Sequence, residues 1–176
     1  MKIKLFQFFT GVLFFGLMCS SCCQKSNQDT EKPKSEANVI LKDYGAEPTV
    51  LNIDAYTLAN DNFRIALWTG TKFQVTLMSI PVGGEIGLEQ HPETDQFLRI
   101  EDGEAKVMMG DTEESLTFVQ AAEKDFVIIV PAGKWHNLIN TGDKPVKLYS
   151  IYSPVEHTFG TLHKTFEEAE EAEHHD

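Results

Sequence analysis

The chain has 176 residues, of which 41% are hydrophobic, 24% charged and 10% aromatic, and its 27 acidic side chains outnumber 15 basic ones. This length suits one domain, because two cores would each be too small to bury enough apolar surface, and the ordinary hydrophobic content argues against wholesale disorder or a polytopic membrane protein. A formal charge of −12 argues against a nucleic-acid partner, since phosphate binding needs a basic face.

Residues 1–22 have the pattern of a signal peptide. Lys2 and Lys4 precede an apolar run over residues 5–18, and small residues follow it. Such a run is too short to span a bilayer comfortably, so cleavage is favoured over the alternative, a single-pass anchor.

All three cysteines, Cys19, Cys22 and Cys23, lie at the end of this segment. The run Ser20-Ser21-Cys22 resembles a bacterial lipoprotein signal, in which the cysteine after the cleavage site receives the lipid. Cys22 is the favoured site, although Cys19 stands where the family prefers Leu. The resemblance implies an exported protein of the bacterial cell envelope, periplasmic or at the outer membrane, held on a membrane by an N-terminal lipid.

Residues 23–38 are polar and lack apolar periodicity, which is typical of a flexible tether. From residue 39 onward, short β-rich runs alternate with turn residues. The expected strands are residues 49–53, 63–69, 73–80, 96–100, 105–109, 115–119, 126–130, 135–140 and 146–152. Their regular spacing without helical periods predicts an all-β sandwich or barrel of antiparallel strands over residues 39–165.

Two local signals refine this prediction. Asp102-Gly103, between two expected strands, predicts a tight hairpin, because both central positions of such a turn need positive φ. Residues 166–176 form an acidic C-terminal segment, in which residues 166–173 favour a short helix with Thr165 as its N-cap.

Four side chains with nitrogen or oxygen donors stand out within the expected barrel. Glu89 and His91 are two residues apart, so on an extended strand they point to the same side. Gln96 follows after a break at Pro92, and His136 comes much later. Together they could hold a divalent metal such as iron, manganese, nickel, zinc or copper, and the absence of thiolates argues against a structural zinc site.

Two motifs that contain these residues resemble those of a small single-domain cupin of type 2. The first motif matches Gly83, Glu89-Gln90-His91, Gln96 and Gly103, and the second matches Pro131, Gly133, His136 and Asn140, with Asp125 in place of the leading glycine. The resemblance extends over residues 73–153. It implies a double-stranded β-helix, or jelly-roll barrel, with a metal near one open end, a small-molecule ligand or substrate, and association as a homodimer.

The motif residues also depart from the family pattern. The usual first His is Glu89, and the usual Glu is Gln96. One carboxylate is therefore kept, which matters because a site of neutral ligands alone would hold a divalent cation less well. We predict Glu89, His91, Gln96 and His136 as metal ligands. The alternatives are a barrel that has lost its metal, or a register slip that brings in Asp95.

Other polar residues receive simpler interpretations. Glu85 is a candidate catalytic acid or base at the barrel mouth. Asn140 is expected to satisfy backbone groups at a strand end, and His157 and His163 are expected to be solvated residues of a late loop. The sequence therefore favours a metal-dependent oxygenase, isomerase or lyase acting on a small polar, sugar-derived or carboxylated molecule. The alternative function is a non-catalytic ligand-binding or scaffolding cupin.

Overall fold

The computed structural model describes residues 38–173. The elements in chain order are α1 (Ile53–Ala59), β1 (Arg64–Thr69), β2 (Gln74–Ile80), β3 (Glu89–Gln90), β4 (Asp95–Asp102), β5 (Glu104–Gly110), β6 (Phe118–Glu123), β7 (Val127–Val130), β8 (Trp135–Asn140), β9 (Val146–Ser153), β10 (Leu162–His163) and α2 (Phe166–Glu173). The predicted signal peptide, its cysteines and the tether up to residue 37 lie outside the described residues. In residues 38–173, no helix has the length and apolar character needed to cross a membrane.

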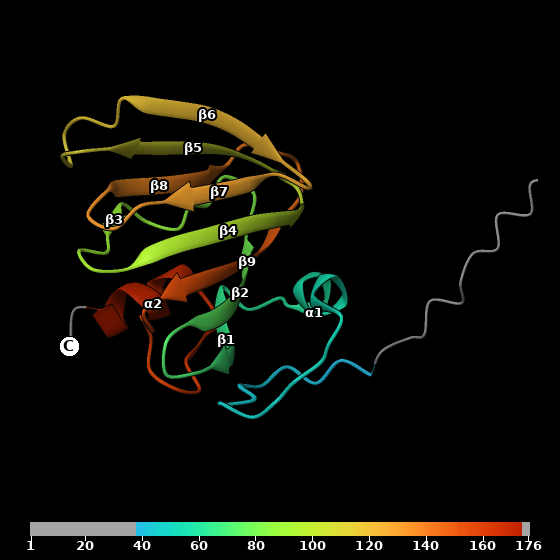
Figure 1. The fold of residues 1–176 in the computed structure, drawn as a ribbon. Helices are drawn as coiled ribbons and strands as arrows, with labels where there is room; N and C mark the ends of the chain where they lie inside the picture. The colour runs from blue at the N-terminus through green and yellow to red at the C-terminus, as the bar shows by residue number, and fades with distance from the viewer. Residues whose placement is uncertain (1–37, 174–176) are drawn as a thin grey trace, which may run out of the picture. The chain divides into compact units, whose positions relative to one another are not determined.

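The strands form two antiparallel sheets (Figure 1). The six-stranded sheet has the order β10-β1-β2-β9-β4-β7, and the four-stranded sheet has the order β3-β8-β5-β6. Side chains from both sheets meet in one apolar cluster, which includes Ile80 and Leu98 from the first sheet and Val107 and Leu138 from the second. This arrangement confirms the predicted all-β barrel.

The side chains that point into the barrel change from polar to apolar along the strands. Along β2, β4 and β9, the inward-pointing polar residues are Gln74, Thr76, Gln96, Ser150 and Tyr152, and the apolar ones are Met78, Ile80, Leu98, Ile100, Val146 and Leu148. Because β9 runs antiparallel to both β2 and β4, Tyr152 is paired with Gln74 on one side and with Gln96 on the other. The polar residues therefore gather at one end of the barrel, and the apolar core fills the other.

The predicted strand over residues 49–53 was wrong, because residues 49–52 have no regular structure and helix α1 begins at Ile53. The side chain of Asn52 accepts a hydrogen bond from the Ala55 amide at 3.2 Å, and Asp54 lies in the first turn, where a negative charge is favourable. Tyr56 of the helix packs with Ile65, Leu67 and Leu77 on the outer face of the six-stranded sheet. Tyr56 is thus buried by a short capped helix, and Leu51 and Ile53 pack against the same cluster, whereas Val50 is exposed.

The predicted Asp102-Gly103 hairpin was also wrong, because β4 and β5 belong to different sheets. Gly103 alone links them, and its φ is +94°, whereas Asp102 is not among the residues with positive φ. A Cβ at Gly103 would lie 2.9 Å from the Cα of Val146, so only glycine fits there. The chain therefore turns a corner of the barrel at this point.

The predicted C-terminal helix is confirmed as α2. Thr165 Oγ1 accepts a hydrogen bond from the Glu168 amide at 3.3 Å, and Glu168 in return accepts one from the Lys164 amide at 2.6 Å. Phe166 meets Phe63 edge to face, and Ala169 is buried in the main core, so the helix is fixed to the barrel.

Candidate metal centre

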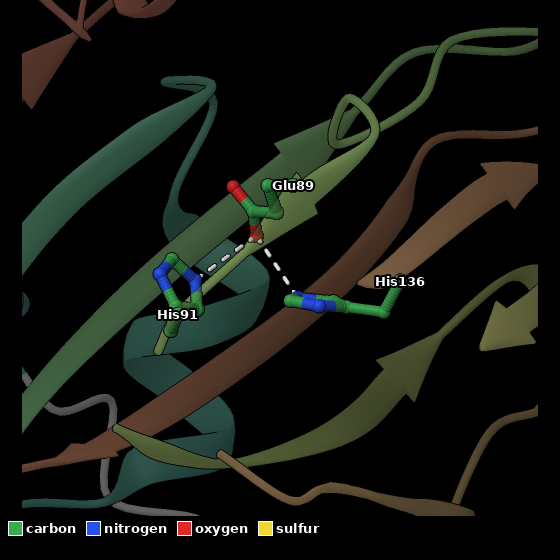
Figure 2. A group of neighbouring side chains, drawn as sticks. All are labelled: Glu89, His91 and His136. Atoms are coloured by element: carbon green, nitrogen blue, oxygen red, sulfur yellow. Dashed lines mark ion pairs between the residues drawn. The ribbon is translucent and has the colours of Figure 1, made fainter. Parts of the chain in front are cut away.

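Three of the predicted ligands converge at the polar end of the barrel. Glu89 on β3 is paired directly with His136 on β8, and His91 follows β3 at once. Figure 2 shows the Glu89 carboxylate between the two imidazoles; its Oε1 lies 3.2 Å from Nε2 of His136 and 3.4 Å from Nε2 of His91. Their three ligand atoms all lie within 4.8 Å of one another.

The far side of each imidazole ring is held by an oxygen. Nδ1 of His91 lies 2.9 Å from Oε1 of Glu156, and Nδ1 of His136 lies 3.1 Å from the carbonyl oxygen of Lys134. An N–H at each Nδ1 leaves the lone pair on Nε2, and both Nε2 atoms are buried without a hydrogen-bond partner. This pattern of partners is typical of metal-ligating histidines, so the donor set fits a metal ion.

Electrostatics keep the carboxylate of the site ionised. Burial by itself would raise the pKa of Glu89, but the contacts with His136 and His91 and the charge of Arg64 outweigh it and hold the pKa well below its usual range. Arg64 is 1% exposed, with Nη2 3.7 Å from Oε2 of Glu89. A buried anion held in this way attracts a cation.

His91 is the group that would exchange a proton for a metal. Burial by itself would lower the pKa of His91, but the hydrogen bonds and charges of Glu156 and Glu89 outweigh burial. The pKa is therefore raised above its usual value, to about 9. Because metal ligation requires neutral imidazole, a metal and a proton compete for Nε2 of this ring.

The fourth predicted ligand, Gln96, is buried on the interior face of β4. Its Nε2 donates a hydrogen bond to Oγ of Ser150 at 3.1 Å, while its Oε1 is buried without a partner. Its neighbour across the ladder, Tyr152, meets the His91 ring edge to face at 5.6 Å. The amide oxygen is thus the free atom of this side chain.

Two other carboxylates, those of Glu85 and Asp95, form hydrogen bonds with residues outside the cluster. Oε2 of Glu85 accepts a hydrogen bond from Nδ2 of Asn137 at 2.6 Å, and Asn137 alternates with His136 along β8, so the two point to opposite faces of the strand. Oδ1 of Asp95 accepts a hydrogen bond from the Ala132 amide at 2.9 Å and is exposed. The structure brings neither carboxylate into the cluster.

A polar cavity of about 330 Å³ adjoins the cluster, and its lining includes Glu89, His91, Glu156, His157, Thr161 and His163. The expectation that His157 and His163 are solvated was wrong, because both are half-buried and line this cavity. Glu156 was missed altogether. Glu156, His157 and His163 lie in or beside the connection between β9 and β10. The hydrophobic pattern of this connection predicts neither a strand nor a helix, so the adjacent pair Glu156-His157 is the one sequence feature that could have indicated a site.

The contact between Glu156 and His91 can be tested directly, because Glu156 orients a proposed ligand and is not itself one of the three residues in the cluster. A Glu156→Gln variant is expected to weaken metal binding by about 10- to 100-fold, because a neutral amide oxygen accepts the His91 Nδ1–H hydrogen bond more weakly than the carboxylate does and makes Nε2 a weaker metal ligand. Metal affinity can be measured by competition with a chromophoric chelator. Glu93→Gln, which changes an exposed carboxylate on the neighbouring loop, serves as the control and is expected to bind as the wild type does.

Comparison with known proteins agrees with the observed fold. A family model described as a cupin domain matches residues 76–152. The chain is 53% identical over 145 residues to the uncharacterized protein YrkC of Bacillus subtilis, an overlap that covers 82% of this chain and 78% of the relative.

Solved structures give the same picture. BH2720 from Bacillus halodurans is 52% identical with a TM-score of 0.73, over 74% of this chain and 98% of that one. An uncharacterized protein with a double-stranded β-helix domain from Klebsiella pneumoniae is 21% identical with a TM-score of 0.52, over 68% of this chain and 100% of that one, and shares the fold. The chain therefore belongs to the cupin family.

Proposed function

We propose that the protein binds one divalent metal ion through Glu89, His91 and His136, and that it is a metal-dependent enzyme acting on a small polar molecule. The observation that carries this proposal is the convergence of one carboxylate oxygen and two buried, unpartnered imidazole nitrogens. Two imidazoles and one carboxylate suit iron, manganese, nickel, zinc or copper.

Gln96 is the proposed fourth ligand. Its Nε2 is engaged by Ser150, which fixes the orientation of the amide and leaves Oε1 as a free, buried acceptor. A buried acceptor without a partner is unfavourable unless a cation or a donor satisfies it.

A bound divalent metal supplies Lewis-acid polarisation of a substrate oxygen and lowers the pKa of a coordinated water molecule. The protein's own groups support that chemistry. The contacts with His136 and His91, together with the charge of Arg64, keep Glu89 anionic. Glu156 orients the His91 ring, and the polar cavity beside these residues has room for a molecule of a few carbon atoms. Oxygenase, isomerase and lyase reactions all use these elements.

Metal content is the first experiment. We expect one metal ion per chain in the purified protein, measured by inductively coupled plasma mass spectrometry. Uronates, diketones and thiols would then be screened for turnover, with iron, nickel, manganese and zinc supplied separately. A protein that takes up none of these metals contradicts the proposal, and a stoichiometric metal without turnover of any compound would favour a ligand-binding cupin.

We further propose that the protein is exported and anchored by a lipid on Cys22. The support is the basic, apolar and small-residue order of residues 1–22, with the cysteine placed directly after Ser20-Ser21. In cells fed labelled palmitate, the wild-type chain is expected to incorporate label, and Cys22→Ser is expected to lose it. A Cys23→Ser variant is the control, and loss of label in that variant alone would move the lipid to Cys23.

A homodimer is the proposed assembly. Strands β6 and β7 end the two sheets, and several of their apolar side chains are about half exposed, namely Phe118, Val119, Val127 and Ile129. Open strand edges with apolar side chains favour pairing with another chain. Ile129→Glu is expected to convert a dimer to a monomer in analytical ultracentrifugation, whereas a wild-type protein that sediments as a monomer would contradict this assembly.

A further inference from the structure

His157 is held in the wall of the polar cavity by a single buried side chain. Nε2 of Gln74 donates a hydrogen bond to the His157 carbonyl oxygen at 2.9 Å, and Oε1 of Gln74 accepts one from the His157 amide at 2.9 Å. The same Nε2 also donates to Oγ1 of Thr69 at 2.9 Å, and Gln74 is fully buried. Both backbone groups of His157 are therefore fixed, which is unusual for a residue in a connection between strands.

The ring of His157 packs against the Tyr152 ring, and its Nε2 has no hydrogen-bond partner. It stands nearly perpendicular to the Tyr152 ring, at 84° and 5.0 Å, and Tyr152 meets His91 in the same way. Nε2 of His157 is buried and makes no hydrogen bond, although the residue lines the cavity that Glu89 and His91 also line. A ligand in this cavity can supply the missing partner.

The charge state of His157 indicates which chemical group of a ligand can pair with its Nε2. Burial, assisted by the charge of Arg64, lowers the pKa of His157 to about 3, so the ring is neutral under ordinary conditions. A neutral imidazole has one donor and one acceptor, and the hydroxyl-bearing Thr158 and Thr161 line the same cavity. The two threonine hydroxyls already contact each other at 3.2 Å, so among these groups Nε2 of His157 is the one that lacks a partner. A neutral imidazole matches a hydroxyl group, which also donates and accepts, better than it matches an anionic carboxylate.

We propose that His157 is a specificity-determining residue that hydrogen-bonds a hydroxyl group of the substrate, so that the cavity takes small hydroxylated molecules in preference to analogues that carry a methyl group at the same place. This inference rests on the proposed function, because the cavity is that of the candidate metal centre. A site that is built to pair with a hydroxyl group rejects the analogue that lacks it, since its own polar atom is then left unpaired.

The test uses glycolate and propionate, which differ by a hydroxyl in place of a methyl group. Both are titrated calorimetrically into the zinc-loaded protein, with zinc content measured on the same sample. We expect the wild type to bind glycolate about three- to tenfold more tightly, the range for one net hydrogen bond. The His157→Phe variant keeps a ring against Tyr152 but loses the polar atom, so it is expected to lose the preference and retain zinc and propionate binding. His157→Gln, which restores a polar group, is expected to recover part of the preference.

The outcomes separate this inference from the metal proposal. A preference for glycolate that persists in His157→Phe would arise from chelation of the metal and would overturn the inference. Equal binding of the two acids by the wild type, or binding of neither by the zinc-loaded protein, would overturn it as well. If the wild type takes up no zinc and none of the other metals, the metal proposal fails, and the same titration on the metal-free protein decides whether His157 still prefers glycolate.

Discussion

Glu89→Gln is expected to strip the protein of its metal, while the same change at Glu85 leaves the metal in place. Within residues 38–173, Glu89 is the only carboxylate in the cluster with His91 and His136. Its replacement by a neutral amide removes the charge that offsets the cation and leaves the Arg64 guanidinium, 3.7 Å away, to repel it. We expect the affinity to fall by more than the roughly 10- to 100-fold that loss of an outer partner costs.

The measurement is metal per chain after dialysis, together with the dissociation constant from chelator competition. Glu85→Gln is a matched control, because it makes the same substitution four residues earlier, on a side chain bonded to Asn137 rather than to the cluster. Circular dichroism would verify that both variants are folded. A folded Glu89→Gln protein with wild-type metal content would place the metal elsewhere.

Asn140→Ala is expected to lower the free energy of unfolding more than Asn137→Ala does. Asn140 is 2% exposed, and its Nδ2 lies 2.9 Å, 3.0 Å and 2.9 Å from the carbonyl oxygens of Ile80, Pro81 and Lys144. Its Oδ1 accepts a hydrogen bond from the Gly142 amide at 2.9 Å. Truncation leaves several backbone groups without partners at once, so we expect a loss of about 2–4 kcal/mol in the free energy of unfolding.

Urea denaturation followed by tryptophan fluorescence would give this value. Asn137→Ala on the same strand is the comparison, because Asn137 makes one side-chain bond, to Glu85, and its loss is expected to cost about 1 kcal/mol. Equal losses for the two variants would mean that Asn140 does not tie these turns together. The prediction that Asn140 satisfies backbone groups at a strand end is confirmed by these bonds.

Most of the longer strands were predictable because the alternation of side chains along a strand is a local rule. Alternation along β4 places Gln96, Leu98 and Ile100 on one face, and this face is indeed interior. The motif resemblance then supplied what spacing could not, namely that His136 lies beside Glu89. The roles of the four predicted ligands stay a prediction that metal analysis must test.

The contacts of Arg64 and Gln74 could not be predicted from the sequence, because they join residues that are far apart along the chain. Arg64 reaches Glu89 from another sheet, and Gln74 binds the backbone of His157, 83 residues away along the chain. No periodicity links such pairs. Helix α1 is a different case, since Asn52 and Asp54 are recognisable cap and first-turn residues, and a search for caps would have found it.

The separation of polar and apolar interior residues at opposite ends of the barrel has a consequence for how this protein can evolve. The apolar core lies at one end of the barrel, around Leu98 and Leu148, while the candidate metal centre lies at the other end, near Gln96 and Tyr152. Residues at the polar end can be exchanged without disrupting the apolar packing that stabilises the fold. The same barrel can thereby accommodate different ligands through substitutions at its polar end.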